Sequence, residues 1–184
     1  GGFASSSPYA TVGAQREMVI MMSYEFTLAL VIVAIAWRIV PMTDADPFML
    51  STVAAYPVWN LVGPLGVVGA LVLLFGLLTV TPGEVSTVPF DIAEAETEIA
   101  GGILVEYSGR NLALFYLSDA MKAFVMVSLI VALFFPYNLS PVIGIGAAIP
   151  AAIVDGLFFL LKVFVIMFVS VTLVRTAMAR FKIS

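Results

Sequence analysis

Six carboxylates lie close together in one polar stretch of the chain, residues 81–110. The chain has 12 acidic residues in total, so this stretch holds half of them, and its first basic residue is Arg110. Clustered carboxylates can bind and release protons, or present a negative surface to a partner protein. The alternative is a solvated loop that only joins two apolar segments. The six acids are Glu84, Asp91, Glu94, Glu96, Glu98 and Glu106.

A second set of charged residues stands inside long apolar segments. A charge at the centre of a bilayer costs at least about 2.5–3.5 kcal/mol, so it is rarely without a role. Desolvation favours the neutral form of such groups, and their proton affinity is therefore easily changed. The set predicts a polar axis that relays protons; the alternative is a set of structural salt bridges, with Asp119 and Lys122 pairing on their own helix. Its members are Glu25, Asp119, Lys122, Asp155 and Lys162.

The composition requires lipid as the main solvent. Hydrophobic residues make up 62% of the 184 residues and charged residues 11%, against about 25% charged in soluble domains. The net charge of −4 gives no reason to expect a nucleic-acid partner. With neither Cys nor His, the chain lacks the usual ligands of iron–sulfur clusters, haem and most zinc sites. We expect no catalytic residue and no metal site, and we expect redox cofactors in other subunits.

Four apolar segments are long enough to cross the hydrocarbon core, which takes about 20 helical residues. They predict an all-α integral membrane protein with a bundle of about four transmembrane helices, in a single membrane domain over residues 1–184. Residues 1–17 are expected to form a loop, residues 49–56 a short interfacial helix, and Pro82-Gly83 the end of the second span. The four predicted spans cover residues 18–40, 58–80, 111–135 and 151–174.

The acidic stretch between the second and third spans predicts a loop that contains a short helix over residues 91–100. Gly101-Gly102 would end that helix. On a period of 3.6 residues, Asp91, Glu94 and Glu98 share one face.

An even number of spans places both chain ends and the loop 81–110 on the same side of the membrane. That side carries most of the basic residues, so the positive-inside rule makes it cytoplasmic. We therefore expect a multi-pass protein of the cell membrane, with the acidic loop and both ends in the cytoplasm. The basic residues on that side are Arg16, Arg110, Arg175, Arg180 and Lys182.

Taken in order, several short motifs resemble one family of membrane subunits. The family joins the peripheral redox arm to the membrane arm in respiratory complex I, and has relatives in energy-converting membrane-bound nickel–iron hydrogenases. Its members have further spans before and after this stretch, so we expect the chain to be part of a larger subunit or of a divided one. The motifs are Ser23-Tyr24-Glu25, Pro89-Phe90-Asp91, Val105-Glu106-Tyr107 and Arg175-Thr176-Ala177.

The resemblance implies roles for individual residues. Glu25, Glu84 and Asp119 match an acidic path that leads from the loop into the membrane, and Lys122 and Lys162 join the predicted path by their places in the spans. The remaining matches are the acidic coupling loop, made of Asp91, Glu94, Glu96, Glu98 and Glu106, and the basic helix ends Arg16 and Arg175.

Departures from the complex I pattern place the sequence nearer to the membrane-bound hydrogenase branch or its sulfur-reducing sister. Complex I members typically read F-D-L-T-E-G-E-S-E-L, where residues 90–99 read F-D-I-A-E-A-E-T-E-I. Thr87 stands where complex I usually has Arg, and Asp119 where it usually has Glu. That branch passes electrons from ferredoxin to protons or sulfur compounds and needs no quinone.

The function that this resemblance implies is that of a non-catalytic coupling subunit in a redox-driven ion pump. It would link hydrogen evolution in the peripheral arm to proton or sodium transport. Expected partners are iron–sulfur and hydrogenase-like subunits at the cytoplasmic face, antiporter-like membrane subunits and the lipid bilayer, with iron–sulfur clusters and a nickel–iron centre in the partners. One alternative is a quinone-site subunit of complex I, beside FMN and quinone; another is a structural anchor for the redox arm.

Overall fold

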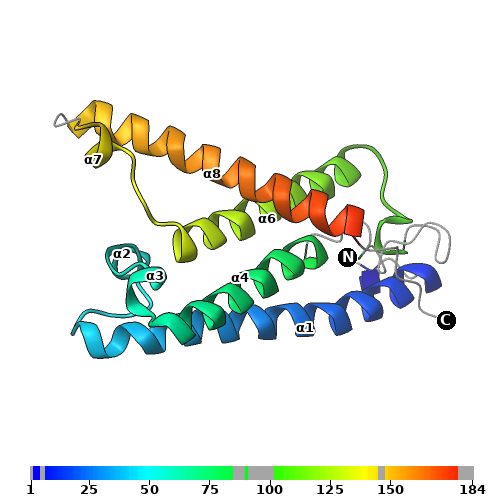
Figure 1. Cartoon of the computed structure of the whole chain (residues 1–184). Coiled ribbons are helices and arrows are strands. Elements are labelled where there is room, and N and C mark those ends of the chain that lie inside the picture. Colours follow the sequence, from blue (N-terminus) through cyan, green and yellow to red (C-terminus); the bar gives the residue numbers. More distant parts are fainter. Residues whose placement is uncertain (1, 5–6, 85–89, 91–101, 145–147, 178–184) are drawn as a thin grey trace. The chain divides into compact units, whose positions relative to one another are not determined.

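Four long helices dominate the computed structural model, which describes residues 2–4, 7–84, 90, 102–144 and 148–177 (Figure 1). Each is long and apolar enough to cross a membrane, with a mean hydropathy of 1.9 to 2.5 over its most apolar part. The described residues contain no strand. The chain is therefore an all-α integral membrane protein, as its sequence predicts. The helices are α1 (Pro8–Ile39), α4 (Pro64–Glu84), α6 (Gly109–Phe134) and α8 (Ala148–Ala177).

Short helical turns connect the long helices. The helix α2 confirms the short helix that was predicted over residues 49–56. The turns within the described residues are η1 (Gly2–Ala4), η2 (Val40–Met42), α2 (Leu50–Ala55), α3 (Val58–Leu61), η3 (Gly102–Leu104) and α7 (Ser140–Ile143).

Helix α1 begins at Pro8, and the prediction of a loop over residues 8–17 is wrong. Proline suits the first turn of a helix because its ring already holds a helical φ angle and the first N–H groups have no partner inside the helix. The backbone N–H and the hydroxyl of Thr11 both donate to the carbonyl of Ser7, each at 3.0 Å. These bonds start the helix among small polar residues that resemble a loop in sequence.

The second predicted span, residues 58–80, is not one helix. Helix α3 ends at Leu61, Val62 has an extended backbone with φ −104° and ψ 133°, and α4 begins at Pro64. A proline disfavours helical geometry in the residue before it, which explains the break at Gly63.

Helix α4 continues through Pro82 to Glu84, so the predicted end at Pro82-Gly83 is also wrong. Proline has no N–H, and the carbonyl of Leu78 therefore loses its usual donor four residues ahead. The hydroxyl of Ser170, in α8, donates to that carbonyl at 2.7 Å. The helix continues because a neighbouring helix supplies the missing hydrogen bond.

The chain forms two compact units. Unit 1 comprises residues 1–29, 78–123 and 170–184, and unit 2 comprises residues 30–77 and 124–169. In unit 2, Val127 and Val131 of α6 pack with Val163 of α8 in a buried cluster. The indole N–H of Trp59 donates to the carbonyl of Phe134 at 2.7 Å and ties α3 to the end of α6.

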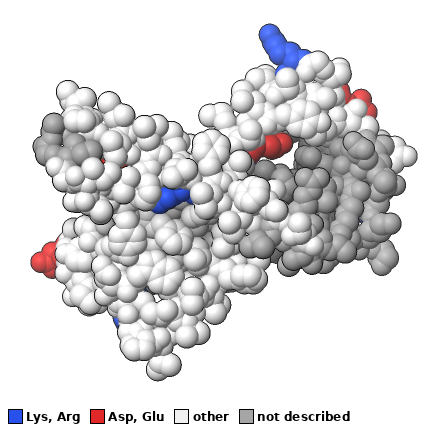
Figure 2. All heavy atoms as spheres, turned by 45° about the horizontal axis from the view of Figure 1, so that its top comes forward, with Lys and Arg blue, Asp and Glu red and all other residues white. Residues whose placement is uncertain are grey.

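Much of the described surface is apolar. On the face drawn in Figure 2, charged side chains form only a few separate spots. Large apolar side chains are highly exposed in the isolated chain, among them Leu65 at 91%, Trp37 at 77% and Met22 at 75%. Such a surface needs lipid or partner subunits to cover it.

Candidate functional site

A charged cluster in unit 1 brings together side chains from three long helices. The ammonium nitrogen of Lys122, in α6, lies 3.2 Å from a carboxylate oxygen of Glu84, the last residue of α4. Asp119 precedes Lys122 by one turn on α6, and Glu17 of α1 is half-buried within electrostatic range of the other three groups. We refer to Glu17, Glu84, Asp119 and Lys122 as the charged cluster.

The charged cluster holds three carboxylates and one ammonium group. It would carry a net charge of −2 with all four groups ionised. The side chain of Glu84 is only 11% exposed, so water screens its charge poorly, whereas the side chain of Lys122 is 36% exposed and its charge is partly screened. Excess charge in such surroundings is costly unless protons or further cations compensate it. The arrangement therefore suits proton exchange. The number of protons that the carboxylates hold would depend on the charges nearby.

Two contacts hold the last turn of α4, which carries Glu84. Ser170 bonds the Leu78 carbonyl as described above. The ring of Tyr24, in α1, lies against Gly83 so closely that a Cβ atom there would come within 2.6 Å of the tyrosine hydroxyl oxygen. With Tyr24 in this position, glycine at residue 83 leaves room for the close approach, and a larger residue would force the ring to shift.

The structure brings together three of the five residues of the predicted path, namely Glu84, Asp119 and Lys122. Lys122 forms its ion pair with Glu84 of α4, a partner that the sequence-based alternative of a pair within one helix did not name. Glu25, beside Tyr24 on α1, is exposed in the isolated chain.

Glu17 belongs to the charged cluster but was not among the predicted site residues. Sequence analysis missed it because residues 8–17 resemble a loop in composition. One signal was available: Glu17 and Tyr24 are seven residues apart, a spacing that places both on one face of a helix.

Lys162, the fifth residue of the predicted path, lies in unit 2. Its ammonium group donates to the carbonyls of Phe135 at 2.8 Å and Tyr137 at 2.7 Å. Both carbonyls come just after the end of α6, where a helix leaves backbone acceptors without partners. Lys162 therefore secures the chain as it leaves α6.

Asp155 secures the next part of the same connection. One of its oxygens accepts the N–H groups of Leu139 at 2.9 Å and Ser140 at 2.8 Å. The other accepts the hydroxyl of Ser140 at 2.7 Å. These contacts match the structural alternative for the charges in the spans, as far as this residue is concerned.

Most of the acidic coupling loop lies outside the described residues. This applies to Asp91, Glu94, Glu96 and Glu98, to the predicted helix over residues 91–100 and to the side chain of Arg175. Glu106 is exposed after η3, and Arg16 is half-buried in α1.

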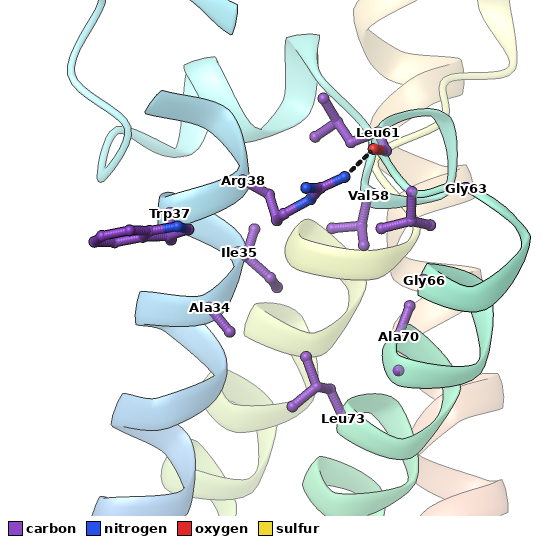
Figure 3. Close-up of a pocket in the computed structure, with 12 residues that line it drawn as sticks. Ala34, Ile35, Trp37, Arg38, Val58, Leu61, Gly63, Gly66, Ala70 and Leu73 are labelled. Atoms are coloured by element: carbon purple, nitrogen blue, oxygen red, sulfur yellow. Dashed lines mark hydrogen bonds between the residues drawn. The ribbon is translucent and has the colours of Figure 1, made fainter. Parts of the chain in front are cut away.

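An apolar groove of about 540 Å³ lies in unit 2 between α1, α3 and α4 (Figure 3). At one end, the guanidinium group of Arg38 points toward the chain before α4 and donates to the Leu61 carbonyl at 2.8 Å. Small residues of α4, Gly66 and Ala70, form part of its lining. Small residues on a membrane helix usually allow close helix packing.

The whole chain matches a known family. The family model described as NADH dehydrogenase matches residues 1–184. The chain belongs to this family.

Individual relatives come from two kinds of redox complex. Over 182 residues the chain is 35% identical to the H subunit of NADH-quinone oxidoreductase from Leptospira biflexa, a match covering 98% of this chain and 48% of the relative. Over 179 residues it is 36% identical to Hydrogenase-4 component C of Escherichia coli, with 97% and 52% covered. The chain spans about half the length of these curated relatives.

These relatives confirm the predicted resemblance to a subunit shared by complex I and membrane hydrogenases. They also support, together with the four apolar helices, a membrane subunit of a redox complex.

Proposed function

We propose that the chain is a non-catalytic coupling subunit that links electron transfer in a peripheral redox arm to transport of protons or sodium ions across the cell membrane. The observation that carries this proposal is the ion pair between Glu84 and Lys122. Glu84 is the last residue of α4, and the acidic stretch continues directly after it in the sequence. A change in that stretch would therefore act first on this pair.

The pair can convert a movement of the loop into a change of protonation. Two unit charges about 4 Å apart interact by about 4 kcal/mol at an effective dielectric constant of about 20. The partial exposure of Lys122 reduces this figure for the pair with Glu84. Separating the two would leave the carboxylates of the charged cluster without a nearby ammonium group, which favours uptake of a proton within the cluster, and re-forming the pair would favour its release. The proposed path comprises Glu25, Glu84, Asp119, Lys122 and Lys162, and we add Glu17 to it because Glu17 belongs to the charged cluster.

The proposal places all redox cofactors in partner subunits. The absence of Cys and His from this chain supports that assignment. The acidic coupling loop would face iron–sulfur and hydrogenase-like subunits in the cytoplasm, with iron–sulfur clusters and a nickel–iron centre in or beside them. The exposed apolar side chains would contact lipid and antiporter-like membrane subunits.

The test compares Asp119→Asn and Glu25→Gln with wild type in the assembled complex in sealed membrane vesicles. Ion uptake and electron transfer are measured together, and their ratio is the readout. We expect a lower ratio in at least one variant while subunit assembly and electron transfer persist. A wild-type ratio in both would overturn the relay, and loss of assembly in both would favour the structural anchor.

A quinone-linked complex is the second candidate. It is favoured by the relatives whose names include NADH-quinone oxidoreductase. An open cavity of about 330 Å³ also lies at the start of α6, where Tyr107 and Asn111 contribute polar groups to a lining that includes Phe115. Labelling by a photoreactive quinone within residues 107–118 would support this candidate. Ferredoxin-dependent hydrogen evolution that quinone analogues do not inhibit would contradict it.

A further inference from the structure

We infer that Ser170 is a positioning residue for Glu84: its hydroxyl completes the last turn of α4 and so fixes where the Glu84 carboxylate stands relative to Lys122. This inference rests on the proposed function of the ion pair, and it assigns a role to a buried serine on a third helix. Ser170 is 1% exposed.

The need for Ser170 comes from Pro82. A proline inside a helix removes one N–H donor from the backbone, and such a position is where helices bend. In α4 the carbonyl of Leu78, four residues before Pro82, lacks this backbone donor. The Ser170 hydroxyl donates to it instead, at 2.7 Å. The turn that follows contains Gly83 and Glu84. Its geometry is therefore set partly by α8 instead of by α4 alone.

A second contact limits the same turn from another direction. The Tyr24 ring of α1 occupies the space where a side chain at residue 83 would begin. It also packs edge-on against Phe90, with ring centroids 6.3 Å apart. The turn bearing Glu84 thus contacts α8 through Ser170, α1 through Tyr24 and α6 through Lys122.

A restrained turn matters because the ion pair is short and directional. A shift of about 1 Å in a functional group can change a rate a hundredfold where geometry controls the chemistry. Without the Ser170 bond, the turn at Pro82 would be freer to bend, and Glu84 would spend less time beside Lys122. Coupling would then be lost without any change to a charged group.

The experiment compares five forms of the assembled complex: wild type, Ser170→Ala, Ser170→Thr, Pro82→Ala and the double variant Pro82→Ala/Ser170→Ala. Ser170→Thr keeps a hydroxyl. Pro82→Ala returns an N–H donor to the Leu78 carbonyl, so the helix no longer needs Ser170. The readouts are hydrogen exchange of the backbone amides in residues 79–84 and the ratio of ions transported per electron. Pro82→Ala alone serves as the reference for the double variant.

For Ser170→Ala we expect exchange in residues 79–84 to rise about tenfold and the ion-to-electron ratio to fall at least twofold. Ser170→Thr and the double variant should return both readouts close to their references. Should Ser170→Ala fail to assemble, the double variant should still assemble. Unchanged exchange in Ser170→Ala, or a defect that Pro82→Ala does not relieve, would overturn the inference.

The two proposals can fail separately. If Ser170→Ala loosens the turn and leaves coupling intact, Ser170 has only a structural role. A wild-type ratio in Glu84→Gln would instead remove the proposed function of the pair itself.

Discussion

The ammonium nitrogen of Lys122 lies 3.2 Å from a carboxylate oxygen of Glu84, and the two side chains come from different membrane helices. This contact joins the middle of α6 to the end of α4. It also pairs the first acid of the acidic stretch, residues 81–110, with a charge on another helix. Under the proposed function, a signal that the stretch receives from a partner would reach the membrane through this contact.

We predict that Lys122→Met destabilises the protein by about 2 kcal/mol. Removing one partner of a fully buried pair costs about 3–5 kcal/mol because the other charge stays uncompensated, and the 36% exposure of Lys122 should reduce that cost through solvent screening. The double variant Glu84→Gln/Lys122→Met should recover most of the loss. Denaturant unfolding of the solubilised protein measures both, and a double variant less stable than Lys122→Met would contradict the pairing.

A second prediction concerns the contacts of Asp155. Asp155→Ala removes the acceptor for three part-buried donors at Leu139 and Ser140, and we expect a lower unfolding midpoint because these donors lose their partner. Asp155→Asn keeps one acceptor oxygen and should lose less. The unfolding midpoints of the two variants provide the measurement, and equal losses would show that the acceptor oxygens do not matter.

Lys162→Met should loosen the segment after α6. The variant removes the donor to the carbonyls of Phe135 and Tyr137, while the aliphatic part of the side chain is kept. We expect faster hydrogen exchange over residues 135–140 than in wild type. Lys162→Arg, which keeps a charged donor, should show a smaller effect, and unchanged exchange in Lys162→Met would contradict the capping role.

Trp59→Phe separates a hydrogen bond from aromatic packing. The indole N–H donates to the Phe134 carbonyl at 2.7 Å, and the Trp59 ring packs near Phe134 and Phe135 with centroid distances of 6.1 and 6.4 Å. Phenylalanine keeps most of the packing, so we expect a loss of about 1 kcal/mol, typical of one hydrogen bond. Thermal unfolding would measure it. Trp59→Leu also removes the aromatic packing and should cost more, and an equal cost would assign the effect to the hydrogen bond alone.

Sequence reasoning located the membrane helices well but not all of their ends. Long apolar runs are a strong signal, because about 20 such residues suffice to cross the bilayer. The ends of these helices depend on hydrogen-bond partners, some of which are far away in the sequence. Pro82 signals a helix end in sequence, and only the fold shows that Ser170 supplies the donor that lets the helix continue.

The site was also predictable only in part, because contacts between distant residues cannot be seen in the sequence. Glu84, Asp119 and Lys122 stand out as charges in or beside apolar runs, and the family resemblance selected the two acids. The pairing of Lys122 with Glu84 joins residues 38 positions apart, and a helical period within one segment cannot reveal it. Glu17 was missed because the start of α1 was placed too late.

The most direct test of the coupling role is the ion-to-electron ratio of Glu84→Gln in the assembled complex. Ion uptake into sealed vesicles and electron transfer are recorded in the same sample, and Asp44→Asn provides a control because Asp44 is an exposed carboxylate outside the charged cluster. We predict that Glu84→Gln continues to transfer electrons with a ratio at least fivefold lower, while Asp44→Asn keeps the wild-type ratio. A wild-type ratio in Glu84→Gln would contradict the account.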